Sequence, residues 1–307
     1  MQQEVMKPMG VGRMLDLSFQ LYRKHFVKLM LIMLICYGPF YLVNVLIQGQ
    51  YVQSLLDVND IMNYSVSDAE PLISPDIVVL VLLLGVLVVF VLTPVVVASI
   101  VFLVHQALQG EEAPSALRLL RMSFKRYWGL LGSSIVFGLI LAGLVIALFI
   151  AFFVMGVISK LVSGVIGGIL FFLLAVGAVF GFYYFAIRFM YFLPVVAHKE
   201  DSIGIGRSWG LTRKSFWRLF GLFFLQMLFI YIINFGASFL LALVPMNGIL
   251  FMLLQLFLSL LTGPMIFVAY AVSYTDLKVR DGMGLEEMIN RIVPDPSMPQ
   301  PPAEHTL

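Results

Sequence analysis

Long apolar stretches alternate with short polar segments along this chain. Six of the stretches are close to or above the roughly 20 residues that an α-helix needs to cross a bilayer. The predicted spans are residues 29–47, 77–108, 128–158, 161–187, 219–244 and 249–273. The pattern therefore predicts an all-α membrane protein in which residues 1–293 form a single polytopic domain. Residues 294–307 are rich in proline, and we expect a disordered cytoplasmic tail there.

A basic amphipathic segment precedes three of the spans. Residues 18–29 and 208–219 share, at identical spacing, a Ser, an aromatic residue, a Leu, two adjacent bases, a second aromatic residue, a base and a Leu. Residues 125–128 fit the same register more loosely. Each copy precedes two spans, so we predict three repeats of an amphipathic interfacial helix plus a helical hairpin, which gives six transmembrane helices. Residues 207–220 are expected to form one such helix, with basic and aromatic residues on opposite faces.

The charged residues sort to one side of the predicted spans. Of the 19 Lys and Arg residues, all except Lys160 fall in segments that six spans place on the same side. The long loop after the first span, residues 48–76, holds acids but no base. Cytoplasmic loops carry an excess of Lys and Arg, so we expect both termini in the cytoplasm. Only 12% of the chain is charged and 61% is hydrophobic, which excludes a water-soluble domain.

Two interpretations of the basic residues beside the spans stay open. They are ordinary topology signals and interface anchors, or three basic helices hold anionic lipid headgroups, with about 1 kcal/mol from each base. The candidates for lipid or interface contact are Arg23, Lys24, Lys28, Lys125, Arg126, Arg207, Arg213, Lys214 and Arg218. We expect membrane lipids and a membrane protein as possible partners. The bases are too few and too close to the spans to indicate nucleic-acid binding.

Arg188 is unusual because apolar sequence flanks it on both sides. An arginine at membrane depth needs a partner or a route to water. One interpretation is that its side chain extends to the interface and marks the end of the fourth span. The other is a structural ion pair, and the candidate partners are Asp276 and Glu200.

No set of residues indicates catalysis. His25, His105, His198 and His305 are scattered, and none has metal-ligand spacing with a second His or with Cys36. The common nucleotide-binding and hydrolase motifs are also missing. The sequence therefore predicts no catalytic residue, no metal site and no cofactor. We also expect Pro94 to kink the second span.

Residues 14–26, 188–213 and 274–280 carry a family resemblance. Their most distinctive part is Tyr274-x-Asp276-Leu277-Lys278-x-Arg280. Together they resemble the membrane domain of glycerophosphoryl diester phosphodiesterases, a family that includes stand-alone bacterial integral membrane proteins. The resemblance covers about residues 8–290 and implies a six-helix, multi-pass protein of the bacterial cell membrane. It implies no enzyme activity, because the hydrolase domain that carries the phosphodiesterase chemistry is not part of this sequence.

Two function classes remain. The first is a non-enzymatic membrane protein that acts as a lipid-associated scaffold or as the membrane partner of another protein. The alternative is a permease or a lipid or small-molecule transporter with a path between the helical hairpins. A polar cavity reaching mid-membrane would favour the permease or transporter, whereas a tightly packed apolar centre would favour a scaffold.

Overall fold

The computed structural model describes residues 8–56, 75–161, 164–244 and 248–292. Six of its helical segments are long and apolar enough to cross a membrane: Phe26–Val45, Val78–Leu108, Tyr127–Ser159, Val165–Ala197, Phe216–Leu241 and Ile249–Gly282. The predicted all-α membrane fold is therefore confirmed, with one segment at each predicted span. The predicted tail, residues 294–307, lies outside the described residues.

Each hairpin of long helices follows a short helix. The first unit contains α2 (Val11–Lys24), α3 (Phe26–Leu56), α5 (Pro75–Leu87), the π-helical turn η2 (Val88–Leu92) and α6 (Thr93–Leu108). The second contains α7 (Ala116–Phe124), α8 (Tyr127–Leu161), α9 (Gly164–Phe189) and α10 (Phe192–Ala197). The third contains α11 (Ile205–Thr212), α12 (Phe216–Ala242) and α13 (Gly248–Ile292). The three predicted basic segments fall where the short helices α2, α7 and α11 end and the next long helix begins, so they do not coincide with the short helices themselves.

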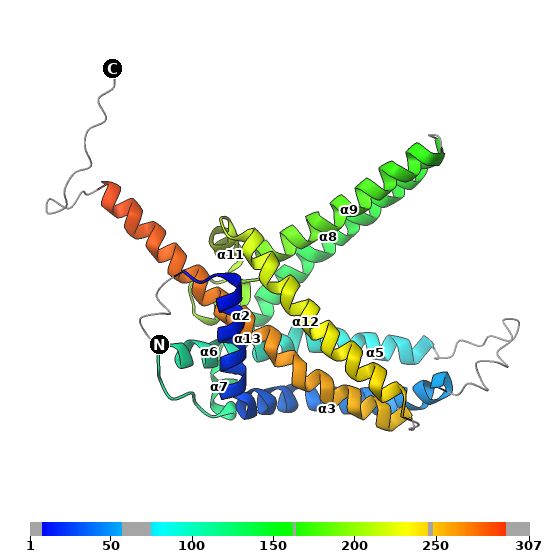
Figure 1. The fold of residues 1–307 in the computed structure, drawn as a ribbon, viewed down its shortest axis with the longest axis horizontal. Coiled ribbons are helices and arrows are strands. Elements are labelled where there is room, and N and C mark those ends of the chain that lie inside the picture. The colour runs from blue at the N-terminus through cyan, green and yellow to red at the C-terminus, as the bar shows by residue number, and fades with distance from the viewer. Residues whose placement is uncertain (1–7, 57–74, 162–163, 245–247, 293–307) are drawn as a thin grey trace, which may run out of the picture.

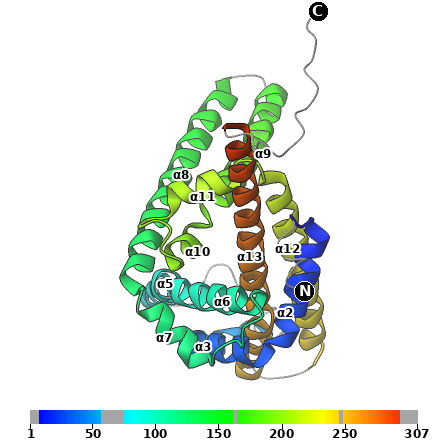
Figure 2. The same cartoon turned by 90° about the vertical axis from the view of Figure 1, so that its left-hand side faces the viewer.

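The long helices spread like a fan from one crowded end of the molecule. In Figure 1, α3, α5, α12 and α13 reach the right-hand side, and the α8–α9 hairpin leans away from them. The short helices gather at the other end, where α13 continues beyond the bundle (Figures 1 and 2). The far end of α3 and the start of α5 lie at the other end of the molecule from α11 (Figure 1). We call the crowded end, formed by α2, α6, α7, α10, α11 and their neighbouring helix ends, the hub.

The buried core lies at the hub. Fully buried side chains from α2, α6, α7, α12, α13 and the turn before α10 belong to it, among them Met14, Leu103, Leu119, Tyr191, Leu219 and Leu277. In the most apolar stretch of Tyr127–Ser159, by contrast, 0% of the residues are buried inside the protein. Phe149 and Phe153 on α8 are 71% and 74% exposed. Lipid is the solvent that makes such faces stable, so the α8–α9 hairpin depends on the bilayer.

The second span changes its helical geometry next to Pro94. A proline has no N–H, so the carbonyl of Phe90 loses its usual donor four residues later. The helix contains the π-helical turn η2 at this place, in which each hydrogen bond joins residues five apart instead of four. The hydroxyl of Thr93 donates to the carbonyl of Val88 (3.1 Å) and accepts from Tyr37 (3.0 Å). The structure therefore has a π turn on the N-terminal side of Pro94, and the kink itself stays a prediction.

The predicted single helix over residues 207–220 is wrong. α11 ends at Thr212, Arg213–Ser215 form a turn, and α12 begins at Phe216. The Thr212 hydroxyl bonds to the carbonyls of Ser208 (2.9 Å) and Arg188 (3.3 Å), which anchors the end of α11 to α9. This anchoring sets the direction of α11. The helix α12 has a separate axis, because it forms the fifth membrane-spanning helix.

Candidate functional site

The predicted lipid-contact bases fall into three groups. Four are exposed on the helix ends at the hub: Arg23, Lys24, Arg213 and Lys214. Three already have polar partners in the protein: Lys28 with the Ala113 carbonyl, Arg207 with Asp281 and Glu200, and Arg218 with Asp276. The last two, Lys125 and Arg126, line a pocket. Only the first and third groups have their charge available to an outside ligand.

The side chain of Arg188 lies against aromatic rings where α9 meets α11. Its Cζ is 3.9 Å from the ring centroid of Trp209 and 5.6 Å from that of Tyr184, and the residue is 3% exposed. The main-chain carbonyl of Arg188 accepts a hydrogen bond from the Ser208 hydroxyl (2.8 Å). A desolvated cation on a Trp face contributes about 2 kcal/mol, so this contact fixes α11 on α9.

The predicted ion pair of Arg188 with Asp276 or Glu200 does not form among the described residues. Both carboxylates have other cationic partners, and the Arg188 side chain is buried against rings instead. The buried side chain does not extend to the protein surface, but Arg188 does stand in the last turn of α9, as a marker of the end of that helix would. The sequence identified the residue as unusual but not the aromatic surface that surrounds it.

Asp276 is the centre of a closed ionic cluster. Its carboxylate is fully buried and bonds to Arg218 Nη2 (2.7 Å), Arg280 Nε (3.1 Å) and the backbone N–H of Met9 (2.6 Å). Arg280 also donates to the Met9 carbonyl (3.0 Å). We call Asp276, Arg218 and Arg280 the Asp276 cluster. It ties α12, α13 and the segment before α2 together, and its carboxylate is closed off from solvent.

Glu200 is saturated in a similar way. Its Oε1 accepts from the Tyr274 hydroxyl (2.7 Å) and from Lys278 Nζ (2.7 Å), and Oε2 lies 3.8 Å from Arg207 Nε. Partial burial raises the pKa of Glu200, but the hydrogen bonds from Lys278 and Tyr274 and the two cations outweigh it, so the pKa lies below its usual value. Glu200 is therefore ionised at neutral pH, and its carboxylate interacts with residues of α11 and α13.

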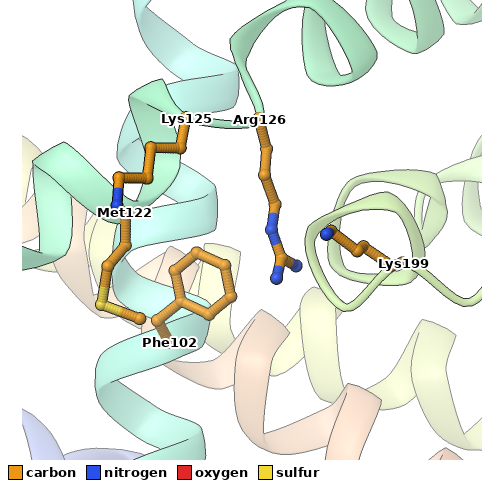
Figure 3. A pocket seen from close by; sticks show the side chains of 5 residues that line it. All are labelled: Phe102, Met122, Lys125, Arg126 and Lys199. Atoms are coloured by element: carbon orange, nitrogen blue, oxygen red, sulfur yellow. The ribbon is translucent and has the colours of Figure 1, made fainter.

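A pocket at the hub has a different composition. It measures 210 Å³ and is lined by Phe102 of α6, Met122 of α7, Lys125 and Arg126 of the α7–α8 turn, and Lys199 after α10. Figure 3 shows the side chains of Arg126 and Lys199 pointing toward each other beside the Phe102 ring. We call this site the basic pocket. The sequence identified two of its cations, but Lys199 was missed because it comes from another part of the chain.

The positive charge of the basic pocket is not neutralised within the described residues. None of its three cations forms an ion pair with a carboxylate there. Arg126 Nη1 is buried without a hydrogen-bond partner, and the Arg126 Cζ lies 5.3 Å from the Phe102 ring centroid. Glu200, next to Lys199 in sequence, is already saturated on the α13 side. The pocket therefore offers positive charge that the described protein does not neutralise, and such charge attracts anions.

His198 lies beside the basic pocket and is neutral. Its ring is 5.7 Å from the Phe102 ring and 4.9 Å from the His105 ring, between centroids. Burial lowers the pKa of His198, although the hydrogen bond to the Pro194 carbonyl (2.9 Å) opposes the shift. The carbonyl can only accept, so Nδ1 carries the proton. His198 thus adds no positive charge to the pocket at neutral pH.

A second, larger cavity lies between the α8–α9 hairpin and the remaining spans. This cleft measures 680 Å³, and its lining comes from η2, α6, α8, α9, α10, α12 and α13. Nearly all lining residues are apolar, for example Phe90, Val97, Leu141, Val179, Phe223 and Met227. Val179 and Met227 are 56% and 58% exposed, so the cleft is open to the surface of the spans. We call it the apolar cleft.

No group of three or more His, Cys, Asp or Glu residues within the described ranges could hold a metal ion. Comparison with known proteins gave no matching family model, no matching curated protein and no matching solved structure. The basic pocket and the apolar cleft are the two features of the described residues that could bind a ligand.

Proposed function

We propose that the protein is a non-enzymatic, lipid-associated integral membrane protein that holds a lipid acyl chain in its apolar cleft. The observation that carries this proposal is the cleft itself. Its 680 Å³ falls within the range of about 300–1,000 Å³ typical of ligand sites. It opens at exposed apolar side chains that face the position of the bilayer, so a chain reaches it without crossing water.

The lining favours an acyl chain over a polar solute. Thr93, Ser134, Tyr183 and Tyr270 are the main polar side chains among its many apolar ones. A polar molecule that enters such a site loses water without gaining enough hydrogen bonds. Of the functions that the sequence leaves open, the cleft therefore supports lipid association more than a permease for a polar solute.

The proposal also includes location and sidedness. The charge sorting and the family resemblance support a multi-pass protein of the bacterial cell membrane with both termini in the cytoplasm. Reporter fusions at each terminus test this, because a reporter active only in the cytoplasm should be active at both. Activity at one terminus alone would contradict an even number of spans. The membership in the resembled family and a membrane-protein partner stay predictions.

Lipid association is tested by making the same Leu→Trp substitution at two positions of α8. Leu141 of α8 lines the cleft, whereas Leu139 is 67% exposed and does not line it. The full-length wild type and the variants Leu141→Trp and Leu139→Trp are washed extensively in detergent, and retained lipid is measured by mass spectrometry. We expect Leu141→Trp alone to lose lipid. Equal retention in both variants, or a wild type without lipid, would overturn the proposal.

One observation favours lipid movement as a second candidate function. The π turn η2 contributes Val89 and Phe90 to the cleft wall, directly before Pro94. A π turn inside a helix is a site where the backbone can change register or angle. Proteoliposomes with a fluorescent phospholipid in both leaflets separate the two candidates, because only a transporter makes the inner-leaflet label accessible to a membrane-impermeant quencher.

A further inference from the structure

We propose that the basic pocket formed by Lys125, Arg126 and Lys199 binds a phosphate group. The group belongs either to a phospholipid headgroup or to a soluble phosphate compound in the cytoplasm. The inference is separate from the proposed function, because the pocket and the apolar cleft have different linings. It also differs from a diffuse attraction between exposed bases and an anionic leaflet.

The first argument is unsatisfied charge. A buried guanidinium nitrogen without a partner costs free energy unless a ligand accepts its hydrogen bond. Arg126 Nη1 is in this situation within the described chain, as are Arg188 Nε and Arg218 Nε. Arg126 differs from these two because it lines an open pocket and a second cation, Lys199, points toward it (Figure 3). Guanidinium and ammonium groups around one space match the several oxygens of a phosphate. The pocket volume of 210 Å³ equals that of about seven water molecules at ~30 Å³ each, so phosphate fits.

The second argument is the backbone at Lys199. α10 ends in a motif in which the N–H of Lys199 bonds to the Val196 carbonyl and the N–H of Glu200 to the Val195 carbonyl, both at 3.0 Å. This motif needs a left-handed residue, and Lys199 has a φ of 60°. The end of α6 uses the same motif with Gly110, at a φ of 79°. Glycine would adopt this left-handed conformation at lower energy than lysine. The presence of lysine is consistent with a role for its ammonium group in the pocket.

The third argument is position. Phe102 of the basic pocket and Val97 of the apolar cleft are five residues apart on α6, or about 7.5 Å along the helix axis. The α10 region likewise supplies Phe192 and Leu193 to the cleft and is followed by Lys199 in the pocket. A phospholipid has this order of parts, with its phosphate next to its acyl chains. The geometry thus admits the lipid as one source of the phosphate.

The experiment uses the full chain in nanodiscs and measures the melting temperature by intrinsic fluorescence. In one arm, nanodiscs of zwitterionic phosphatidylcholine receive increasing inorganic phosphate at constant ionic strength. In the other arm, the buffer lacks phosphate and the nanodiscs contain increasing phosphatidic acid. A ligand that binds only the folded state raises the melting temperature with concentration, so each arm gives an apparent affinity. A rise in the first arm identifies free phosphate and a rise in the second the headgroup, and either supports the proposal.

The variants separate specific binding from general charge. Arg126→Gln should weaken the apparent affinity by about tenfold or more, because it removes charge-assisted hydrogen bonds. Arg121→Gln removes the same charge from an exposed position on α7 outside the pocket and should leave the affinity unchanged. Lys199→Gly removes a pocket cation at a backbone position that suits glycine, so weaker binding by this variant does not reflect unfolding.

Two outcomes would overturn the proposal. One is a wild type whose melting temperature does not respond in either arm. The other is an equal response of Arg126→Gln and Arg121→Gln, which would assign the effect to surface charge. The acyl-chain proposal has its own readout in the retained lipid of Leu141→Trp, so failure of one proposal is distinguishable from failure of the other.

Discussion

The Asp276 cluster and the basic pocket lie at the same end of the molecule, and both hold arginines. In the Asp276 cluster, two arginines and a backbone N–H surround one buried carboxylate. In the basic pocket, Arg126 and Lys199 point toward each other and Lys125 lines the wall, and none of the three has a carboxylate partner among the described residues. The difference shows that basic residues at a membrane protein's hub have two separate roles. One group holds helices together, and the other is available to an anion.

The first prediction tests the closed site and has the largest expected effect. Asp276→Asn removes the charge that compensates Arg218 and Arg280, of which the Arg218 side chain is only 18% exposed. Loss of one partner of a buried pair costs about 3–5 kcal/mol, so we expect a loss of this size in the free energy of unfolding. Reversible unfolding in mixed micelles measures it.

The matched control for that prediction is Asp281→Asn. Asp281 also pairs with an arginine, Arg207, but both side chains are about two-fifths exposed. An exposed pair contributes roughly 0–1 kcal/mol. If the two variants lost the same stability, the Asp276 cluster would not be the closed, buried site that the comparison requires.

The second prediction concerns Arg188, which is neither in the closed site nor in the open one. Trp209→Leu removes the ring against which the guanidinium packs, and we expect a loss of about 2 kcal/mol in unfolding free energy. Trp217→Leu removes a ring that is 73% exposed, so its effect should stay within about 0.5 kcal/mol. Both are measured by the same unfolding method. Equal losses would show that the contact between Arg188 and Trp209 contributes nothing specific.

The third prediction sharpens the argument for the open site. Lys199→Gly should leave stability unchanged or raise it by up to about 1 kcal/mol, because glycine adopts the left-handed conformation without strain. Gly110→Ala places a side chain at the equivalent left-handed position of α6 and should lower stability by about 1 kcal/mol. Thermal unfolding of both variants tests this pair. A clear loss of stability in Lys199→Gly would show that the lysine is retained for the fold.

The fourth and smallest prediction is a pH dependence at Glu200. Its folded-state pKa lies below its usual value, so its ionised form stabilises the protein above the unfolded pKa of about 4.3. That contribution disappears as the pH falls through the folded pKa. Glu200→Gln should therefore lose less stability than the wild type between about pH 6 and acid pH. Parallel melting curves over this range would contradict the role assigned to Glu200.

The sequence alone is sufficient to predict the membrane-spanning segments, but not the tertiary contacts of individual side chains. The spans follow from runs of apolar residues, which is a local property, and each predicted span overlaps one long apolar helix of the structure, although the fourth and sixth helices continue about ten residues beyond the predicted ends. The break at Arg213–Ser215 was missed, because amphipathic spacing continues across it while the Thr212 hydroxyl anchors α11 to α9. Hydropathy does not report such tertiary contacts.

The candidate site shows the same division. Lys125 and Arg126 were identified from their place before a span, but Lys199 comes from a distant part of the chain. Asp276 was expected to pair with Arg188, and its actual partners include the backbone of Met9, 267 residues away in sequence. Neither proximity follows from local pattern, because each depends on how the three units pack at the hub.

The most direct test of the open and closed sites is a cryo-electron microscopy map of the protein in nanodiscs that contain phosphatidic acid. The account predicts density for a bound phosphate between Arg126 and Lys199, and direct contact of Arg218 with Asp276 without added density. A map in which the Arg126 guanidinium pairs with a carboxylate of the protein, and the pocket holds no anion, would contradict it.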